Sequence, residues 1–364
     1  MSLSRRNFLG LGASLSAGAA LGLTGCDRRS SLNLLGLRGA LPPGLPRAFE
    51  NRYSTTAIRQ ELLATPADLF VRLRDQPPRE GLVSLGDRWL STAIHRQLIA
   101  PLPAPLHGWE RLPGAWRQGL ICDAEGLPNP RGQIWGAPYR WGATVVAYRK
   151  AELQTAKLSR RDWGLLWEPA LTQRLALPDD AREVIGLTLK ELGHSYNTPD
   201  PTPVRDLPLA LAQLQKQVRF YSTADSLAAL QQGDVWVTLC SSTDGLQLRQ
   251  RNPEVDFFYP ETGTSLWQDC WVRPKAAPWS EASHDWIGFG WSAAIAPQFG
   301  RITEAASPAL VSSDGRWQGE GLAPGVIPPA HTLAHSEFIL PLDRHSQSLY
   351  QGLWEKMRRR QLSV

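Results

Sequence analysis

The sequence predicts an α/β protein, because runs typical of buried strands alternate with stretches of helical periodicity. Three apolar runs, residues 31–37, 144–148 and 234–242, are rich in Leu, Val or Trp. Alternation of strands and helices favours largely parallel sheets. The body of the chain, residues 32–364, is long enough for two lobes of ~100–200 residues each. A content of 42% hydrophobic and 20% charged residues is typical of a protein with a well-formed core.

The first predicted elements lie in the N-terminal third of this body. Residues 31–37 (SLNLLGL) predict a strand. A helix is expected within residues 42–53, because two prolines are typical of a helix start and apolar side chains then recur at helical spacing, namely Leu45, Phe49 and Tyr53. Residues 81–103 predict a strand, a loop and a helix that carries four apolar side chains on one face: Trp89, Ala93, Ile94 and Leu98.

The second half of the body continues the alternation. A strand is expected at residues 144–148, and a short helix is followed by a strand at residues 174–177. Residues 234–242 and 265–274, which are rich in Val, Trp and Leu, predict two further strands. No internal repeat interrupts the body.

An acidic cluster opens the helix that is expected next to one of these strands. Residues 177–193 read LPDDAREVIGLTLKELG. Asp180 and Glu183 have the spacing of a capping box, in which two side chains bond to the free amides of a helix start, and Gly193 is a typical helix stop. Helix starts normally attract anions, so carboxylates here also predict selectivity for a cation. Arg182 is expected to brace the two carboxylates by an ion pair.

Other candidate residues also follow predicted strands. Asp87 comes after LVSL, Asp180 after LAL, and Ser241 to Asp244 after VWVTLC. Ligands of open α/β sheets bind outside the carboxyl ends of the strands. These side chains are therefore expected to line one cleft.

Composition and motifs argue against several classes of protein. The net charge is only +5, and no basic, aromatic-rich stretch predicts a nucleic-acid partner. Cys122, Cys240 and Cys270 lack metal-ligand spacing and the seven His are scattered, so we predict no metal site and no cofactor. Two buried thiols are expected at Cys240 and Cys270, with a disulfide between them as the alternative. Asp180 and Glu183 could form an acid/base pair, but no nucleophile elbow, zinc motif or phosphate loop supports an exported enzyme.

Several words of the sequence together resemble one family. IWGAPYRWGATVVAYR, LALPDDAREVIGLTLKELGHSYNTPDP, GDVWVTLCSS and GTSLWQDCWVRP follow one another within residues 134–274. They closely resemble the spermidine/putrescine-binding proteins of bacterial ABC-type importers, and residues 31–103 do so more loosely. The resemblance implies a two-lobed periplasmic-binding-protein fold (type II) with two crossover segments and a cleft between the lobes. Lobe 1 is expected to comprise residues 32–140 with 272–364, including a C-terminal helical part, and lobe 2 residues 141–271.

The resemblance also implies ligand contacts. In that family acidic residues hold the ammonium groups of a polyamine and aromatic rings flank its methylene chain, and the matching positions here are Asp180, Glu183, Trp267 and Asp269. Opposite charge offsets the desolvation of a buried ammonium group, and a ring face adds cation–π attraction of ~0.5–2 kcal/mol. Tyr139 and Trp141, on a crossover strand, are further candidates for the cleft lining.

Three departures from the family pattern alter the expected cleft. Residues 37–41 lack the aromatic ring that is usual after the first strand. Asp87 and Arg88 stand where hydroxyl and aromatic groups are usual. Ser241 stands where Trp is expected, with Asp244 shortly after it. The cleft is therefore expected to have lost rings and gained carboxylates, which leaves open a cationic amine that is shorter, more polar or more highly charged than spermidine or putrescine.

The N-terminus predicts export. An Arg-Arg pair precedes the Gly-rich apolar stretch 8–24, which is typical of a twin-arginine signal rather than of a membrane span. The Leu-Thr-Gly-Cys word at its end resembles the lipobox of bacterial lipoproteins. Residues 1–26 are therefore expected to be the signal, Cys26 the lipidated residue, and residues 27–31 a short tether.

The combined prediction is a solute-binding protein that is not an enzyme. It is expected to be a periplasmic monomer, held at a membrane surface by its lipid, that captures a small polyamine-like cation and delivers it to an inner-membrane ABC permease and its ATPase. Thiamine, a basic amino acid and ferric iron remain alternative ligands. The seven Tyr without an adjacent pair argue against iron, and Asp180 and Glu183 argue against an anion.

Overall fold

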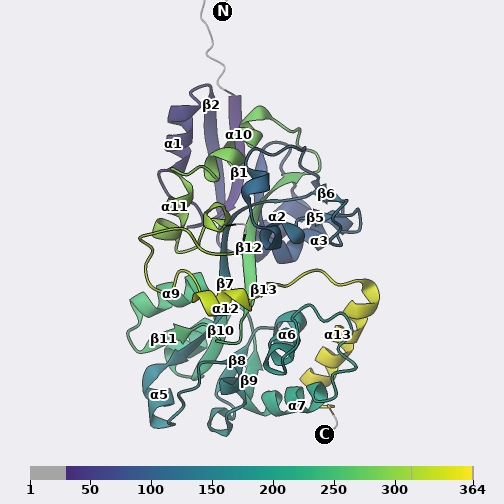
Figure 1. The fold of residues 1–364 in the computed structure, drawn as a ribbon, viewed down its shortest axis with the longest axis vertical. Helices are drawn as coiled ribbons and strands as arrows, with labels where there is room; N and C mark the ends of the chain where they lie inside the picture. The colour runs from purple at the N-terminus through teal and green to yellow at the C-terminus, as the bar shows by residue number, and fades with distance from the viewer. Residues whose placement is uncertain (1–29, 313, 363–364) are drawn as a thin grey trace, which may run out of the picture.

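Two lobes, one above the other in Figure 1, make up the protein. The computed structural model describes residues 30–312 and 314–362. Two long strands, β7 (Ala137–Arg149) and β12 (Ser265–Pro274), run between the lobes. The predicted two-lobed α/β arrangement is therefore present.

Lobe 1 is a parallel sheet covered by helices. β1 (Ser30–Leu37) lies between β2 (Thr56–Leu63) and β3 (Leu82–Gly86), and both pairings are parallel. The helices that pack against these strands are α1 (Leu45–Arg52), α2 (Pro66–Asp75), α3 (Asp87–His95) and α10 (Glu281–Gly290). Shorter elements complete the lobe: β4 (Ile99–Ala100), α4 (Gly114–Gln118), β5 (Ile121–Cys122), β6 (Gln133–Ile134) and α11 (Ala296–Gln298).

The predicted apolar positions form the core of this lobe. Leu45 and Phe49 of α1 are buried, and Ala93 and Ile94 of α3 are buried with them in one cluster. Trp89 packs against that cluster from its edge, where its ring stacks on Phe70. The strand and helix within residues 81–103 follow each other without the expected loop, because α3 begins at the residue after β3.

β7 and β12 pair with each other in antiparallel fashion and join the two lobes. β12 is antiparallel to β3 of lobe 1, whereas β7 is antiparallel to β10 (Val237–Ser241) of lobe 2. The strand order is β2-β1-β3-β12-β7-β10-β8-β9. The expectation of largely parallel sheets therefore holds within each lobe but not at the crossover. The chain passes to lobe 2 through β7 and returns through β12, so these strands must run in opposite directions.

Lobe 2 repeats the layered design. β8 (Leu175–Leu177) lies in parallel between β9 (Val218–Tyr221) and β10, and β11 (Val255–Phe258) adds to β7. Its helices are α5 (Lys150–Thr155), α6 (Ala181–Glu191), α7 (Leu207–Gln217), α8 (Ser226–Gln232) and α9 (Ser242–Arg251). Four apolar side chains of α6 are fully buried, namely Val184, Ile185, Leu187 and Leu189. Gly193 ends the helical segment with a positive φ of 80°.

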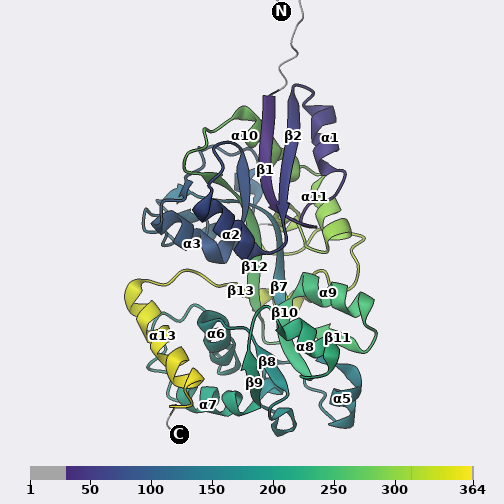
Figure 2. The same cartoon turned by 180° about the vertical axis from the view of Figure 1, so that it is seen from behind.

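The C-terminal part of the chain divides between the lobes. The last helix, α13 (Arg344–Arg358), packs against α6 and α7 of lobe 2, beside which it lies in Figure 2. Tyr350, Trp354 and Met357, at helical spacing on one face, enter the core of lobe 2. The short α12 (Ala330–Ala334) and β13 (Glu337–Phe338) precede it, and β13 pairs with β12. The expected placement of residues 272–364 in lobe 1 is therefore wrong for the C-terminal helix.

No helix within residues 30–312 or 314–362 combines the length and apolar character needed to cross a membrane.

Candidate binding site between the lobes

The acidic cluster of the sequence forms the start of α6 at the lobe junction. Asp180 is the N-cap, and its Oδ1 accepts hydrogen bonds from the amides of Arg182 at 2.8 Å and Glu183 at 3.1 Å. Glu183 does not complete a capping box. Its Oε1 accepts from the hydroxyl of Ser265 at 2.7 Å instead, and only 5% of the residue is exposed. The cap is thus as predicted for Asp180, whereas Glu183 points toward β12.

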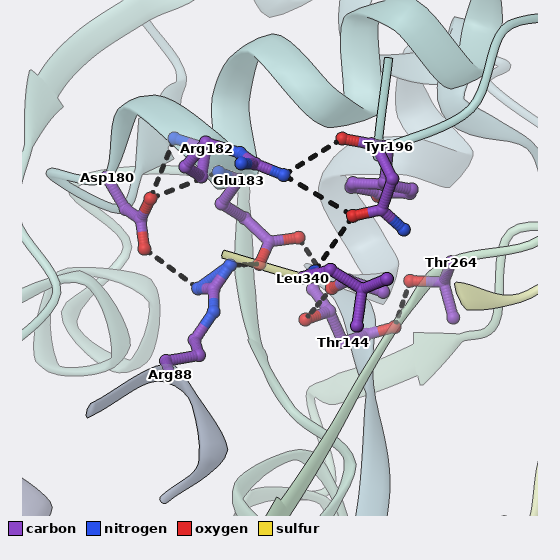
Figure 3. Close-up of polar contacts among 10 residues, drawn as sticks. Arg88, Thr144, Asp180, Arg182, Glu183, Tyr196, Thr264 and Leu340 are labelled. Carbon is purple, nitrogen blue, oxygen red and sulfur yellow. Dashed lines mark hydrogen bonds and ion pairs between the residues drawn. The ribbon is translucent and has the colours of Figure 1, made fainter. Parts of the chain in front are cut away.

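Arg88 joins the two lobes at this point. It lies in the first turn of α3, and its guanidinium donates to Asp180 Oδ2 at 2.8 Å and to Glu183 Oε2 at 3.0 Å (Figure 3). Burial raises the pKa of Glu183, with the charge of Asp180 adding to the effect and Arg88 opposing it. Although burial acts in the opposite direction, the carboxylates of Glu183 and Asp180 raise the pKa of Arg88. The two carboxylates thus have a resident counterion from the other lobe.

Arg182 does not brace the carboxylates as expected. Its guanidinium turns away from them and donates to the carbonyl of Tyr196 and the side chain of Asn197, as Figure 3 shows. It also lies 4.8 Å from the ring centroid of Tyr350 in α13. Residue 182 points to the other side of the helix start because its neighbours 180 and 183 occupy the side that faces lobe 1. The bracing arginine is Arg88.

A second ion pair lies further along β12. Asp269 is 8% exposed and accepts from Arg140 of β7 through Nε at 2.7 Å and Nη2 at 2.6 Å. Trp267 lies between this pair and Ser265, since residues 265, 267 and 269 share one face of the strand. The Trp267 ring packs on Gly142 and lies 5.6 Å from the Arg140 guanidinium.

Asp87 completes the group of acidic side chains. It precedes Arg88 at the start of α3, and burial raises its pKa to about 7, with the nearby charge of Asp269 adding to the effect and Arg88 opposing it. The side chain of Asp269 lies close beneath Gly86, the residue before it. Among the described residues Asp87 makes no ion pair, unlike Asp180, Glu183 and Asp269. It is the carboxylate with most to gain from an added cation.

Three other predicted residues lie outside this group. Tyr139 is 2% exposed, stacks on Trp271 in the core of lobe 1, and shares a hydrogen bond of 2.8 Å with Ser84. Trp141 is fully buried against Trp116. Neither ring can contact a ligand in this conformation, so the structure does not support their expected place in the cleft lining. Asp244 is exposed, and its carboxylate accepts from the hydroxyl of Ser241 at the start of α9.

Sequence reasoning missed Arg140 and Ser265 as members of the site. Arg140 lies 129 positions from its partner Asp269 along the chain, and Ser265 lies 82 positions from its partner Glu183. Arg88 was noted only as a departure from the family pattern. Its position directly after a strand end was the available signal.

A cavity lies beside this group rather than within it. It has a volume of about 1020 Å³ and is lined by Trp116, Leu266, Trp317, Glu337 and Phe338 with their neighbours. Of the predicted ligand contacts, all of which lie in the described part, none lines it. The acidic side chains of α6 instead lie where Arg88 of lobe 1 contacts lobe 2.

Thiols and metal ligands add no further site. Cys122, Cys240 and Cys270 are all free, so the alternative disulfide is not present. Cys270 is buried as expected, whereas Cys240 is only half-buried. Among residues 30–312 and 314–362, no three His, Cys, Asp or Glu side chains are arranged to hold a metal ion. Cys26 lies outside the described residues.

Comparisons with known proteins agree with the architecture. Residues 82–318 match the family described as bacterial extracellular solute-binding protein. The spermidine/putrescine-binding periplasmic protein of Escherichia coli (strain K12) is 25% identical over 224 residues, which cover 62% of this chain and 64% of that protein. The putrescine/cadaverine-binding protein of Pseudomonas aeruginosa is 24% identical over 240 residues, 63% of this chain and 68% of that one. The match thus spans slightly less than two thirds of the Escherichia coli protein.

A solved structure extends the likeness over nearly the whole chain. The spermidine/putrescine ABC transporter substrate-binding protein of Streptococcus pneumoniae superposes with a TM-score of 0.74 at 18% identity, covering 91% of this chain and 99% of that one. At this identity the likeness shows the fold, and the predicted two-lobed type II architecture is confirmed.

Proposed function

Because the chain belongs to the bacterial extracellular solute-binding proteins, we propose that it captures a small cationic amine of polyamine type at the lobe junction. It then delivers this ligand to an ABC-type membrane permease. Relatives named for spermidine, putrescine and cadaverine support the choice of ligand class. In this role the chain makes and breaks no covalent bond, and ligand contacts with both lobes stabilise the closed state.

The excess of carboxylates at the junction carries the proposal. Four carboxylates, those of Asp87, Asp180, Glu183 and Asp269, meet two guanidinium groups, those of Arg88 and Arg140, which leaves two negative charges when Asp87 is ionised. An anion placed there would be repelled, whereas an ammonium group would find a carboxylate that has no counterion.

The acidic contacts are spread along one face of β12. Ser265, which bonds to Glu183, and Asp269 are four residues apart, or about 13 Å at the rise of a strand. The half-buried Trp267 lies between them and offers a ring to methylene groups. A chain-like amine with its charge toward one or both ends fits this arrangement better than a compact ion such as ferric iron.

Calorimetric titration of the full chain tests the proposal. The ligands are n-butylamine, putrescine, cadaverine, spermidine, thiamine and L-lysine, with acetate as an anionic comparison. We expect amines to bind and Asp87→Asn to weaken them about tenfold or more, since a hydrogen bond to a charged group contributes about 1.5–3 kcal/mol. Asp206→Asn, an exposed carboxylate at the start of α7, is the matched control. Binding of no amine, or equal affinity in Asp87→Asn and the wild type, would refute the proposal.

We also propose that the protein is exported by the twin-arginine route to the periplasm and held at a membrane by a lipid on Cys26. The proposal rests on the sequence words around Arg5, Arg6 and Cys26, which lie outside the described residues. Metabolic labelling with an alkyne fatty acid should mark the wild-type chain and not Cys26→Ser. Replacement of both arginines by lysine should leave the precursor uncleaved, and labelling of Cys26→Ser would contradict the lipid site.

A further inference from the structure

Arg88 stands where a ligand cation would be expected. Its guanidinium bonds to Asp180 at 2.8 Å and to Glu183 at 3.0 Å, and it reaches them from the opposite lobe. A planar guanidinium with two donors directed at two carboxylates is a strong form of ion pairing. Arg88 offsets one of the two negative charges of this pair and occupies one oxygen of each carboxylate, so an ammonium group must compete with the guanidinium for the same position.

The two resident arginines differ in how firmly they are held. Arg140 lies within the junction with 7% of its side chain exposed, and it binds a neighbouring strand of the same sheet. Arg88 is 33% exposed, and in the described part of the chain its guanidinium makes only the two contacts that cross between lobes. Arg140 is thus part of the packed structure, whereas Arg88 acts as a tethered group that the lobes share.

Among the described residues of this acidic group, one carboxylate makes no guanidinium contact. Asp180 and Glu183 share Arg88, and one oxygen of Asp269 takes both contacts from Arg140. Asp87 has no counterion among the described residues and lies next to Arg88 in the first turn of α3. The charge that is open to a ligand therefore lies at one end of the junction.

We propose that Arg88 determines ligand specificity: it fills the Asp180–Glu183 position as a tethered cation and limits the ligand to a single ammonium group, which binds at Asp87. This inference rests on the proposed function, since it concerns which cationic amine is taken. A monoamine with an apolar chain satisfies Asp87 and covers Trp267 without displacing Arg88. A diamine must displace the guanidinium or leave its second ammonium group without a partner.

The test compares one ligand pair across variants of the full chain. Calorimetry measures n-butylamine, which has one ammonium group, and putrescine, which has two on the same four-carbon chain. The variants are Arg88→Gln, which keeps a long polar side chain without charge, and Arg88→Lys, which keeps the charge. Arg72→Gln is the matched control, because Arg72 bonds to Glu61 within lobe 1 at 3.0 and 3.1 Å, away from the junction.

We expect the wild type, Arg88→Lys and Arg72→Gln to bind putrescine no more than about threefold tighter than n-butylamine. Arg88→Gln should prefer putrescine by about tenfold or more, because two freed carboxylates then meet the second ammonium group. A wild type that already prefers putrescine tenfold, or an unchanged preference in Arg88→Gln, would overturn the inference while leaving the proposed function intact. If no variant binds any amine, the proposed function itself fails.

Small-angle scattering of the ligand-free proteins provides a readout that needs no ligand. Without the interlobe guanidinium, Arg88→Gln should show a larger radius of gyration than the wild type and Arg72→Gln. Circular dichroism confirms that each variant is folded. Equal radii for all three folded proteins would show that Arg88 does not hold the lobes together, and this too would overturn the inference.

Discussion

The buried pair of Arg140 and Asp269 allows a quantitative test of how the crossover strands are held. Their side chains are 7% and 11% exposed, and both guanidinium contacts, at 2.6 and 2.7 Å, end on the same carboxylate oxygen. Removal of one partner from such a pair leaves a buried charge without compensation, which costs about 3–5 kcal/mol. We expect Asp269→Asn at the lower end of this range, because an amide oxygen still accepts one hydrogen bond.

The opposite change should cost less. In Arg140→Met, Asp269 lies unpaired beside Asp87, but 11% of its side chain is exposed and can keep part of its hydration. We therefore expect a loss of about 2–3 kcal/mol. The double variant Arg140→Met/Asp269→Asn has no unpaired charge and should lose at least about 2 kcal/mol less than the sum of the single variants.

Urea unfolding measures these differences. Circular dichroism and tryptophan fluorescence must give coincident transitions for the two-state treatment to hold in a two-lobed protein. Arg72→Gln, which breaks an exposed pair, should change the free energy of unfolding by less than about 1 kcal/mol. Additive losses in the double variant, or single losses as small as that of Arg72→Gln, would show that the pair does not stabilise the junction.

Four further outcomes follow from other residues. In Gly142→Ala the new methyl group would overlap with the ring of Trp267, so we expect weaker amine binding in calorimetry and a shifted tryptophan emission; an unchanged spectrum would contradict this packing. Burial raises the pKa of Asp87 to about 7, so the folded state keeps the proton of this carboxyl group to a higher pH than the unfolded chain does. The stability that this protonation contributes at low pH should therefore fall as the pH rises through about 7. Amine affinity should rise about tenfold from pH 6 to pH 8, as the ionised fraction grows, and Asp87→Asn should abolish both trends. Burial raises the pKa of Cys122 to about 12 and that of Cys270 well above its usual value, so peptide mapping after iodoacetamide treatment should find both thiols unmodified until the protein is unfolded.

The sequence predicted those parts of the site that depend only on residues close together in the chain. The cap at Asp180 and the stop at Gly193 each arise within one turn of the helix, so spacing alone reveals them. The contact of Arg88 with Asp180 joins residues 92 positions apart. No pattern in a single sequence shows that two helix starts in different lobes face each other. The sequence therefore indicated only that Arg88 departs from the family pattern.

The burial of Tyr139 and Trp141 could not be predicted for a different reason. Alternation along a strand tells the two faces apart only when one face meets solvent, and β7 is buried on both faces over nearly its whole length. The sequence therefore predicts the strand without predicting which side chains look toward the junction. The lobe of the C-terminal helix was predicted wrongly for a similar reason. An apolar stripe indicates that α13 packs against other elements, but it does not indicate to which lobe they belong.

The docking of α13 on lobe 2 places the two ends of the described chain at opposite poles of the molecule. Residue 30 begins β1 at the far end of lobe 1, and residue 362 follows α13 at the far end of lobe 2 (Figure 1). A rotation about β7 and β12 would move these ends relative to each other. A pair of fluorophores fused beyond them would thus report ligand-driven bending by energy transfer, without altering any side chain of the recognition surface.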